Sequence, residues 1–197
     1  MRILIAYDGS IGADAVLFDL RRAGLPQEAE ALVIFVADVW TFKSPSDGPS
    51  GSRAERLDII GLKKARVLAE QSIEEARKVA VRAGEIIQAN FPLWKVDAVS
   101  EGDSPAWAVI RKAEEWAANL IVVGTHGHSA LGRLLLGSVS QRVLYEARCS
   151  VRIARAYGGE NKSPERILIA VDGSPYAEAA VSVVAKRNWT TGSESRV

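Results

Sequence analysis

The sequence contains very little cysteine and has no excess of charge of either sign. Cys149 is the only cysteine among 197 residues, so no disulfide can form within the chain and no cluster of thiolates can hold zinc. Lys and Arg number 25 and Asp and Glu number 24, which leaves none of the positive charge that dominates general affinity for nucleic acid. The composition therefore argues against a disulfide scaffold, a zinc site of the thiolate type and a nucleic-acid partner.

Long apolar runs are also missing. The first apolar segment, residues 2–6, is too short for a signal peptide, and no other stretch is long and apolar enough to span a bilayer. Hydrophobic residues make up 48% of the chain and charged residues 25%, which is ordinary for a folded globular protein. We therefore expect a folded cytoplasmic protein with no membrane contact.

Short apolar segments alternate with longer amphipathic ones along the chain. This alternation is typical of a doubly wound α/β fold, in which a parallel sheet is covered by helices on both faces. Strands are expected at residues 2–7, 31–39, 95–100, 120–123 and 150–154, and helices at 13–20, 62–90, 104–116 and 139–146. Between the second strand and the long helix, residues 40–56 carry three clusters with Pro or Gly, which predicts a loop.

The beginning of the chain is repeated near its end. Residues 166–174 match residues 2–10 at eight of nine positions, which chance does not produce. We therefore expect one complete domain over residues 1–156, a linker over 157–164 and the start of a second, incomplete domain over 165–197. The second unit is expected to contain one strand, one helix and a polar tail from residue 190, and we expect its strand to pair with another molecule.

A glycine-rich segment between the fourth strand and the fourth helix is the strongest candidate for a ligand site. Gly124 and Gly127 are followed after nine residues by Gly137-Ser138-Val139-Ser140, where a helix begins. Free backbone N–H groups at such a helix start attract an anion, and glycine lets the backbone approach a phosphate closely. If the strand order is 3-2-1-4-5, Asp8 leaves the neighbouring first strand at the point where the winding reverses, so one ligand can touch both segments.

Two better-known nucleotide motifs are absent. From Gly127 to Gly132 the spacing is that of a P-loop, yet Arg133 and Leu134 stand where Lys and Ser or Thr are needed. No Gly-x-Gly-x-x-Gly occurs, so redox chemistry with a dinucleotide has no support. His126 and His128 flank Gly127, but no further Cys or His joins them, so we expect no metal site there.

In combination, these motifs resemble the universal stress protein family, and specifically its ATP-binding branch in a tandem-domain form with an incomplete second domain. The similarity covers residues 1–155 as a full domain of five parallel strands in the order 3-2-1-4-5. It implies that Asp8 contacts ribose and that Val36 contacts adenine through its backbone. It also implies a phosphate loop made by Gly124, Gly127, Gly137, Ser138, Val139 and Ser140. The sequence departs from the family pattern at Tyr7 and at Ser150, neither of which belongs to that loop.

The resemblance implies a regulatory protein that binds ATP, with or without Mg²⁺, that acts in the stress response and that forms a homodimer. Two alternatives remain open from the residues alone. One is a weak ATPase, or a protein that phosphorylates itself on Ser138 or Ser140, although no general base can be identified. The other is a dimerisation module in which residues 150–154 pair across subunits and the loop holds no nucleotide. Asp8 also has a local alternative, because Asp-Gly-Ser is a common turn whose carboxylate caps the following helix.

Overall fold

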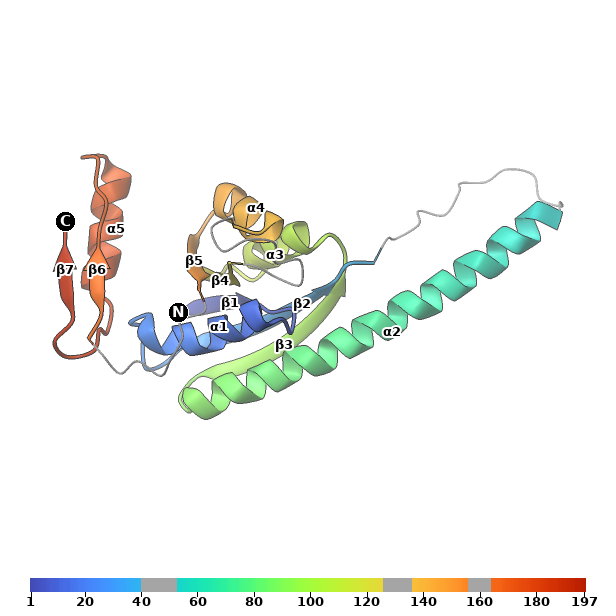
Figure 1. The fold of residues 1–197 in the computed structure, drawn as a ribbon, viewed down its shortest axis with the longest axis horizontal. Helices are drawn as coiled ribbons and strands as arrows, with labels where there is room; N and C mark the ends of the chain where they lie inside the picture. Colours follow the sequence, from blue (N-terminus) through green and yellow to red (C-terminus); the bar gives the residue numbers. More distant parts are fainter. Residues whose placement is uncertain (40–52, 126–135, 156–163) are drawn as a thin grey trace.

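A computed structural model describes residues 1–39, 53–125, 136–155 and 164–197. The chain forms a five-stranded parallel sheet with helices on both faces, followed by a small βαβ unit at the C-terminus (Figure 1). The elements are β1 (Arg2–Ala6), α1 (Ile11–Asp19), a 3₁₀ turn (Leu20–Arg22), β2 (Glu30–Ala37), α2 (Arg53–Asn90), β3 (Lys95–Gly102), α3 (Pro105–Glu115), β4 (Leu120–Gly124), α4 (Ser138–Glu146), β5 (Ser150–Ala154), β6 (Arg166–Leu168), α5 (Pro175–Ala185) and β7 (Glu194–Arg196).

The strand order of the large sheet is β3-β2-β1-β4-β5, which confirms the predicted doubly wound topology. β1 lies at the centre and pairs with β2 from Arg2↔Glu30 to Ala6↔Ile34 and with β4 from Ile3↔Leu120 to Ile5↔Val122. A strand in this position is buried on both faces, which explains why the first residues of the chain are apolar without alternation.

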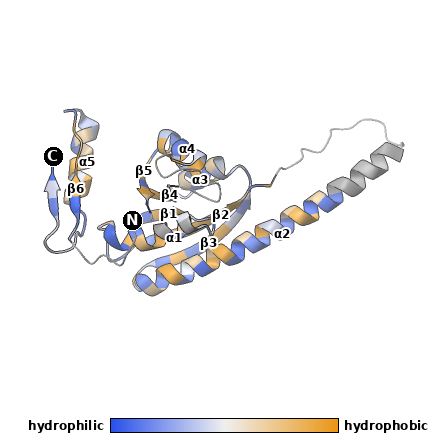
Figure 2. Cartoon of the chain, viewed as in Figure 1, coloured by the Kyte–Doolittle hydropathy of each residue, from blue (hydrophilic) through white to orange (hydrophobic). Residues whose placement is uncertain are grey.

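Two hydrophobic cores lie on the two faces of the sheet. Ile3 and Ile5 of β1 point to the face covered by α1 and α2, whereas Leu4 points to the face covered by α3 and α4. All three side chains have no exposed surface. In Figure 2 the apolar colour is concentrated on the central strands, and the two kinds of colour alternate along α2. Within the described residues, none of the helices combines the length and the hydrophobicity that a membrane span needs.

The second helix begins earlier than the sequence predicts. α2 starts at Arg53, so residues 53–56 belong to a helix and not to the expected loop, and residues 40–52 lie outside the described part of the chain. The Pro and Gly clusters end at Ser52, and the residues that follow are mostly good helix formers. Figure 1 shows that the first half of α2 extends well beyond the sheet.

The C-terminal segment contains a strand that the sequence analysis missed. β7 lies in the tail expected to be merely polar, and it pairs in parallel with β6. The pair Arg166↔Glu194 stands 164 residues after the pair Arg2↔Glu30, so β6, α5 and β7 repeat β1, α1 and β2 in the same register. One edge of β6 is therefore paired within the chain by β7, a strand that the expected pairing with another molecule did not take into account.

Polar contacts connect this βαβ unit to the turn after α1. Arg22 forms a two-pronged ion pair with Glu165, with N–O distances of 2.6 and 2.8 Å. Arg187 donates from Nη1 to the carbonyl of Ala23 at 2.8 Å, and the backbone N–H of Asn188 donates to the carbonyl of Gly24 at 2.9 Å. The unit thus packs against the end of the first helix and adds no strand to the five-stranded sheet.

Candidate functional site

The carboxyl ends of β1 and β4 lie side by side at the centre of the sheet, where the chain winds outward in two directions. A cavity of about 430 Å³ opens there. Its walls come from the ends of β1, β2 and β4 and from the first turns of α3 and α4. Ligands of α/β proteins bind at such a switch point, because the loops diverge and leave a crevice. Of the residues predicted for the site, those that line the cavity are Asp8, Val36, Gly124, Gly137, Ser138, Val139 and Ser140.

Asp8 stabilises the tight turn after β1. Its Oδ1 accepts a hydrogen bond from the backbone N–H of Ser10 at 3.0 Å, and Gly9 between them has φ = +71°, a conformation that favours glycine. The cap of α1 is Ser10, whose Oγ accepts from the N–H of Ala13 at 3.1 Å. The alternative in which Asp8 itself caps the helix is therefore wrong, and its carboxylate borders the cavity.

The first turn of α4 presents backbone N–H groups to the same cavity. Gly137 is the N-cap, and its own N–H donates to the carbonyl of Thr125 at 2.8 Å. The N–H groups of Ser138, Val139 and Ser140 come before the first intrahelical bond, which Gln141 makes to Gly137 at 2.9 Å. Three donors and the positive end of the helix therefore meet at the cavity wall, as a phosphate site requires.

The two serines of this turn have different environments. Ser140 is 5% exposed and donates from Oγ to the carbonyl of Gly124 at 2.5 Å. This bond ties the start of α4 to the end of β4. Neither serine hydroxyl caps the helix, because Gly137 is the N-cap of α4. Ser138 lines the cavity without a hydrogen bond from its hydroxyl to any described residue.

Val36 reaches the cavity from the neighbouring strand. The carbonyl of Ile34 accepts from the N–H of Tyr7 at 3.0 Å, which is the last bond between β1 and β2. Backbone groups alternate in direction along a strand, so those of Val36, two residues later, point the same way as those of Ile34. β1 has already ended there at Ala6, so the backbone of Val36 faces the cavity.

Several residues of the cavity were not predicted from the sequence. Pro105 and Val109 of α3 form one wall, and Phe35 and Asp38 approach from β2 and from the loop that follows. No spacing in the sequence marks the α3 residues, because they approach the glycine segment only through the packing of α3 on the sheet. Gly127, His126 and His128 lie outside the described residues.

Two titratable groups with raised pKa values are Tyr7 at the site and Cys149 at the opposite edge of the sheet, just before β5. Burial, together with the hydrogen bond that the hydroxyl of Tyr7 donates to Oδ1 of Asp14 at 2.6 Å, raises the pKa of Tyr7 well above its usual range. Burial also raises the pKa of the Cys149 thiol, which packs beside the second core. In the described part of the chain, no three His, Cys, Asp or Glu side chains come together as a metal site.

Comparisons with known proteins agree with the fold. A family model described as the universal stress protein family matches residues 1–155. The chain is 32% identical to a universal stress protein of Methanocaldococcus jannaschii over 156 residues, which are 78% of this chain and 81% of that protein. It is 33% identical to one of Thermus aquaticus over 153 residues, covering 78% of this chain and 97% of that protein. A solved universal stress protein of Archaeoglobus fulgidus superposes with a TM-score of 0.63 at 25% identity, covering 93% of this chain and 61% of that one.

Proposed function

The chain belongs to the universal stress protein family, and we propose that it binds ATP in the cavity between Asp8 and the first turn of α4. ATP binding would regulate the contacts that the protein makes with others during stress. Hydrolysis would be slow or absent.

The start of α4 is the observation that carries this proposal. The free N–H groups of Ser138, Val139 and Ser140 border one cavity together with Gly124 and Asp8. A multiply charged anion gains most from such an arrangement, because the donors are already ordered and cost little to align. The N–H groups would hold the triphosphate, the carboxylate of Asp8 the ribose hydroxyls, and the backbone of Val36 the adenine edge.

Mg²⁺ would enter this site with the nucleotide. The described residues offer no cluster of carboxylates or imidazoles to hold a metal by themselves. Mg²⁺ commonly keeps several waters and binds through phosphate oxygens and one or two carboxylates. Asp8 and Asp38 are the acids among the described residues that line the cavity.

The contacts of the two serines favour binding over catalysis. A serine that accepts a phosphoryl group needs a hydroxyl that is free to attack and a base that removes its proton. The hydroxyl of Ser140 donates to Gly124, so it is already engaged. Ser138 is the remaining candidate for self-phosphorylation. Incubation with labelled ATP distinguishes a protein that only binds ATP from an enzyme, because an ATPase releases free phosphate and a self-phosphorylating protein becomes labelled on Ser138.

We also propose that residues 165–197 are the beginning of a second domain of the same family. The unit made of β6, α5 and β7 repeats the register of β1, α1 and β2. Its turn is repeated too, because Oδ1 of Asp172 accepts from the N–H of Ser174 at 2.9 Å and Oγ of Ser174 accepts from Ala177 at 3.2 Å. The Archaeoglobus structure matches 93% of this chain, which is more than residues 1–155.

A homodimer formed through β6 is the assembly that we propose. Ile169 donates its N–H to Arg196 of β7 at 2.8 Å, so the next N–H, that of Ala170, faces the other edge of β6. Antiparallel pairing of two copies about Ile169 would place Arg166 of each opposite Asp172 of the other. Opposite charges at both ends favour this register.

Light scattering on the full chain tests the dimer. The wild type is expected at twice 21.2 kDa, and Ala170→Pro at 21.2 kDa, because proline removes the donor on the open edge while the bond from Ile169 to β7 is kept. Ala170→Ser keeps the N–H and should remain dimeric. A wild-type mass of 21.2 kDa would contradict the proposal.

Nucleotide content is the direct test of the function. After denaturation of the purified protein, mass spectrometry is expected to find ATP in the released material. Calorimetry on the nucleotide-free protein should give one site per chain. Gly127→Asp should weaken binding at least about tenfold, because it places a negative charge in the loop predicted to meet phosphate. If wild type and variant alike give no heat and no thermal shift, the chain does not bind ATP.

A further inference from the structure

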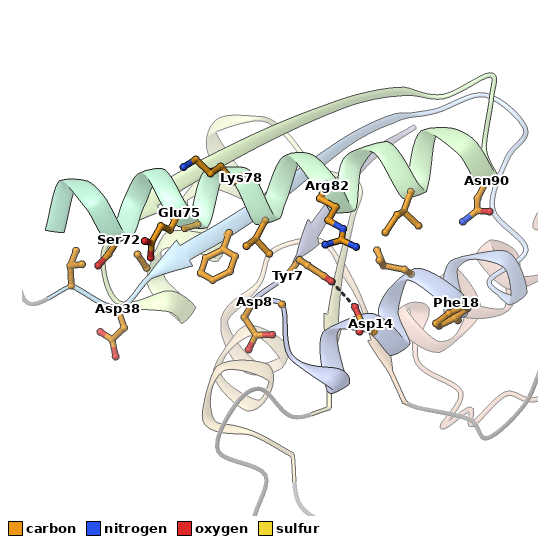
Figure 3. A pocket seen from close by; sticks show the side chains of 18 residues that line it. Tyr7, Asp8, Asp14, Phe18, Asp38, Ser72, Glu75, Lys78, Arg82 and Asn90 are labelled. Atoms are coloured by element: carbon orange, nitrogen blue, oxygen red, sulfur yellow. Dashed lines mark hydrogen bonds between the residues drawn. The ribbon is translucent and has the colours of Figure 1, made fainter. Parts of the chain in front are cut away.

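A second and larger cavity, of about 1050 Å³, lies on the other face of the sheet, between α1 and α2 (Figure 3). It shares one wall with the candidate nucleotide cavity, formed by Tyr7, Asp8, Phe35, Ala37 and Asp38. No residue of α3 or α4 lines it, so the helix start assigned to phosphate does not take part. Its size is at the upper end of the range found for small-molecule sites.

The apolar part of the wall is exposed to an unusual degree. Phe18 of α1 is 69% exposed and Ile86 of α2 is 41% exposed, although both border the cavity. Phe35, near the end of β2, also lines the cavity and packs against the core. An aromatic and an aliphatic side chain that stand open on facing helices provide the apolar surface that a small-molecule site needs.

The charged residues of the wall are Asp8, Asp14, Asp38, Glu75, Lys78 and Arg82, and among them Asp14 and Arg82 approach each other beside Tyr7. Asp14 of α1 accepts from the hydroxyl of Tyr7, which holds its carboxylate at the edge of the cavity. Figure 3 shows the guanidinium of Arg82 reaching from α2 toward Tyr7 and Asp14. Arg82 makes no ion pair or hydrogen bond with any described residue, so its donors remain available to a ligand. Lys78 of the same helix also lines the cavity, but Figure 3 shows its ammonium group on the side of α2 away from Tyr7 and Asp14.

We propose that this cavity binds a small zwitterionic ligand with an apolar body, of which a free apolar amino acid is the simplest kind. Its carboxylate would pair with Arg82, whose planar fork suits two acceptor oxygens. Its ammonium group would contact Asp14, and its side chain would pack on Phe18 and Ile86. A ligand with only one charge would make only one of these two ionic contacts, which lowers its affinity.

Calorimetry with three related probes tests the charge requirement. L-phenylalanine carries both charges, 3-phenylpropanoate lacks the ammonium group and 2-phenylethylamine lacks the carboxylate. At concentrations up to about 10 mM, we expect saturable binding of phenylalanine and at least about tenfold weaker binding of the other two. No saturable binding of any probe, or equal binding of all three, overturns the proposal.

Variants identify the contacts. Arg82→Gln should weaken the binding of phenylalanine about tenfold or more and leave the binding of phenylethylamine unchanged. Asp14→Asn should also weaken the binding of phenylalanine about tenfold or more, but it should leave the binding of phenylpropanoate unchanged. Phe18→Ala should weaken all probes. Arg82, Asp14 and Phe18 are exposed, so each of these variants should keep the fold.

ATP binding is the control, because ATP uses the other cavity and its affinity should be unaffected by Arg82→Gln. Phenylalanine binding that Arg82→Gln does not alter overturns the assignment.

Discussion

An aspartate in place of Gly137 is expected to abolish ATP binding and to raise the melting temperature of the protein at the same time. Gly137 is the N-cap of α4 with φ = −63° and ψ = 156°, an extended conformation that any residue adopts. An aspartate there accepts hydrogen bonds from the first-turn N–H groups and complements the helix dipole, which adds about 0.5 kcal/mol. The same N–H groups are then lost to phosphate, and the carboxylate repels it. We expect the affinity for ATP to fall by at least about 100-fold, as measured by calorimetry.

Gly137→Asn is the matched control for this variant. Asparagine caps the helix about as well as aspartate but carries no charge. It should raise the melting temperature similarly and weaken ATP binding much less than aspartate does. If Gly137→Asp binds ATP as tightly as the wild type, the triphosphate does not lie at the start of α4.

Removing the leucine side chain at the two equivalent positions of the repeat is expected to have very different effects on stability. Leu4 of β1 has no exposed surface, whereas Leu168, 164 residues later in β6, is 82% exposed. Leu4→Ala should lower the free energy of unfolding by about 3 kcal/mol, because it leaves a cavity between the sheet and α3. Leu168→Ala should change it by less than about 0.5 kcal/mol. Urea denaturation followed by tryptophan fluorescence measures both.

The comparison also reports on the surroundings of β6 in solution. The two leucines stand in the same local sequence, so strand propensity cancels between them and only the environment differs. A loss at Leu168 as large as that at Leu4 would show that this face of β6 is covered in solution, contrary to the exposure described here. A small loss of unfolding free energy in Leu4→Ala would contradict the packing of the core between the sheet and helices α3 and α4.

The arrangement of the large sheet was predictable because its signals are local. Each strand is a short apolar run and each helix is an amphipathic segment with a recognisable start, so the strand order 3-2-1-4-5 follows once the resemblance of the glycine segment and Asp8 to a known family is added. The starts of α2 and β7 were missed for opposite reasons. Residues 53–56 lie beside clusters of breakers, and β7 is polar and is a strand only because β6 lies next to it.

The candidate site was predicted as a set of residues but not as a set of contacts. The resemblance to the family implied that Asp8, Val36 and the turn around Ser138 contact one ligand. It did not indicate that Ser10 rather than Asp8 caps α1, nor that the hydroxyl of Ser140 is engaged with Gly124. A capping residue is selected by backbone geometry that several neighbouring polar side chains can satisfy, so spacing alone does not identify it.

By itself, then, the sequence determined the strands and helices of the five-stranded sheet, except for the start of α2, and it determined where the repeat lies and which glycine segment precedes a helix. These properties depend on residues that are close together in the chain. Only the tertiary structure decided that Phe18 and Arg82, 64 residues apart, border one cavity and that Pro105 closes another. Those contacts depend on how α1, α2 and α3 pack on the sheet, which is set by the summed burial of many side chains and is encoded at no single position.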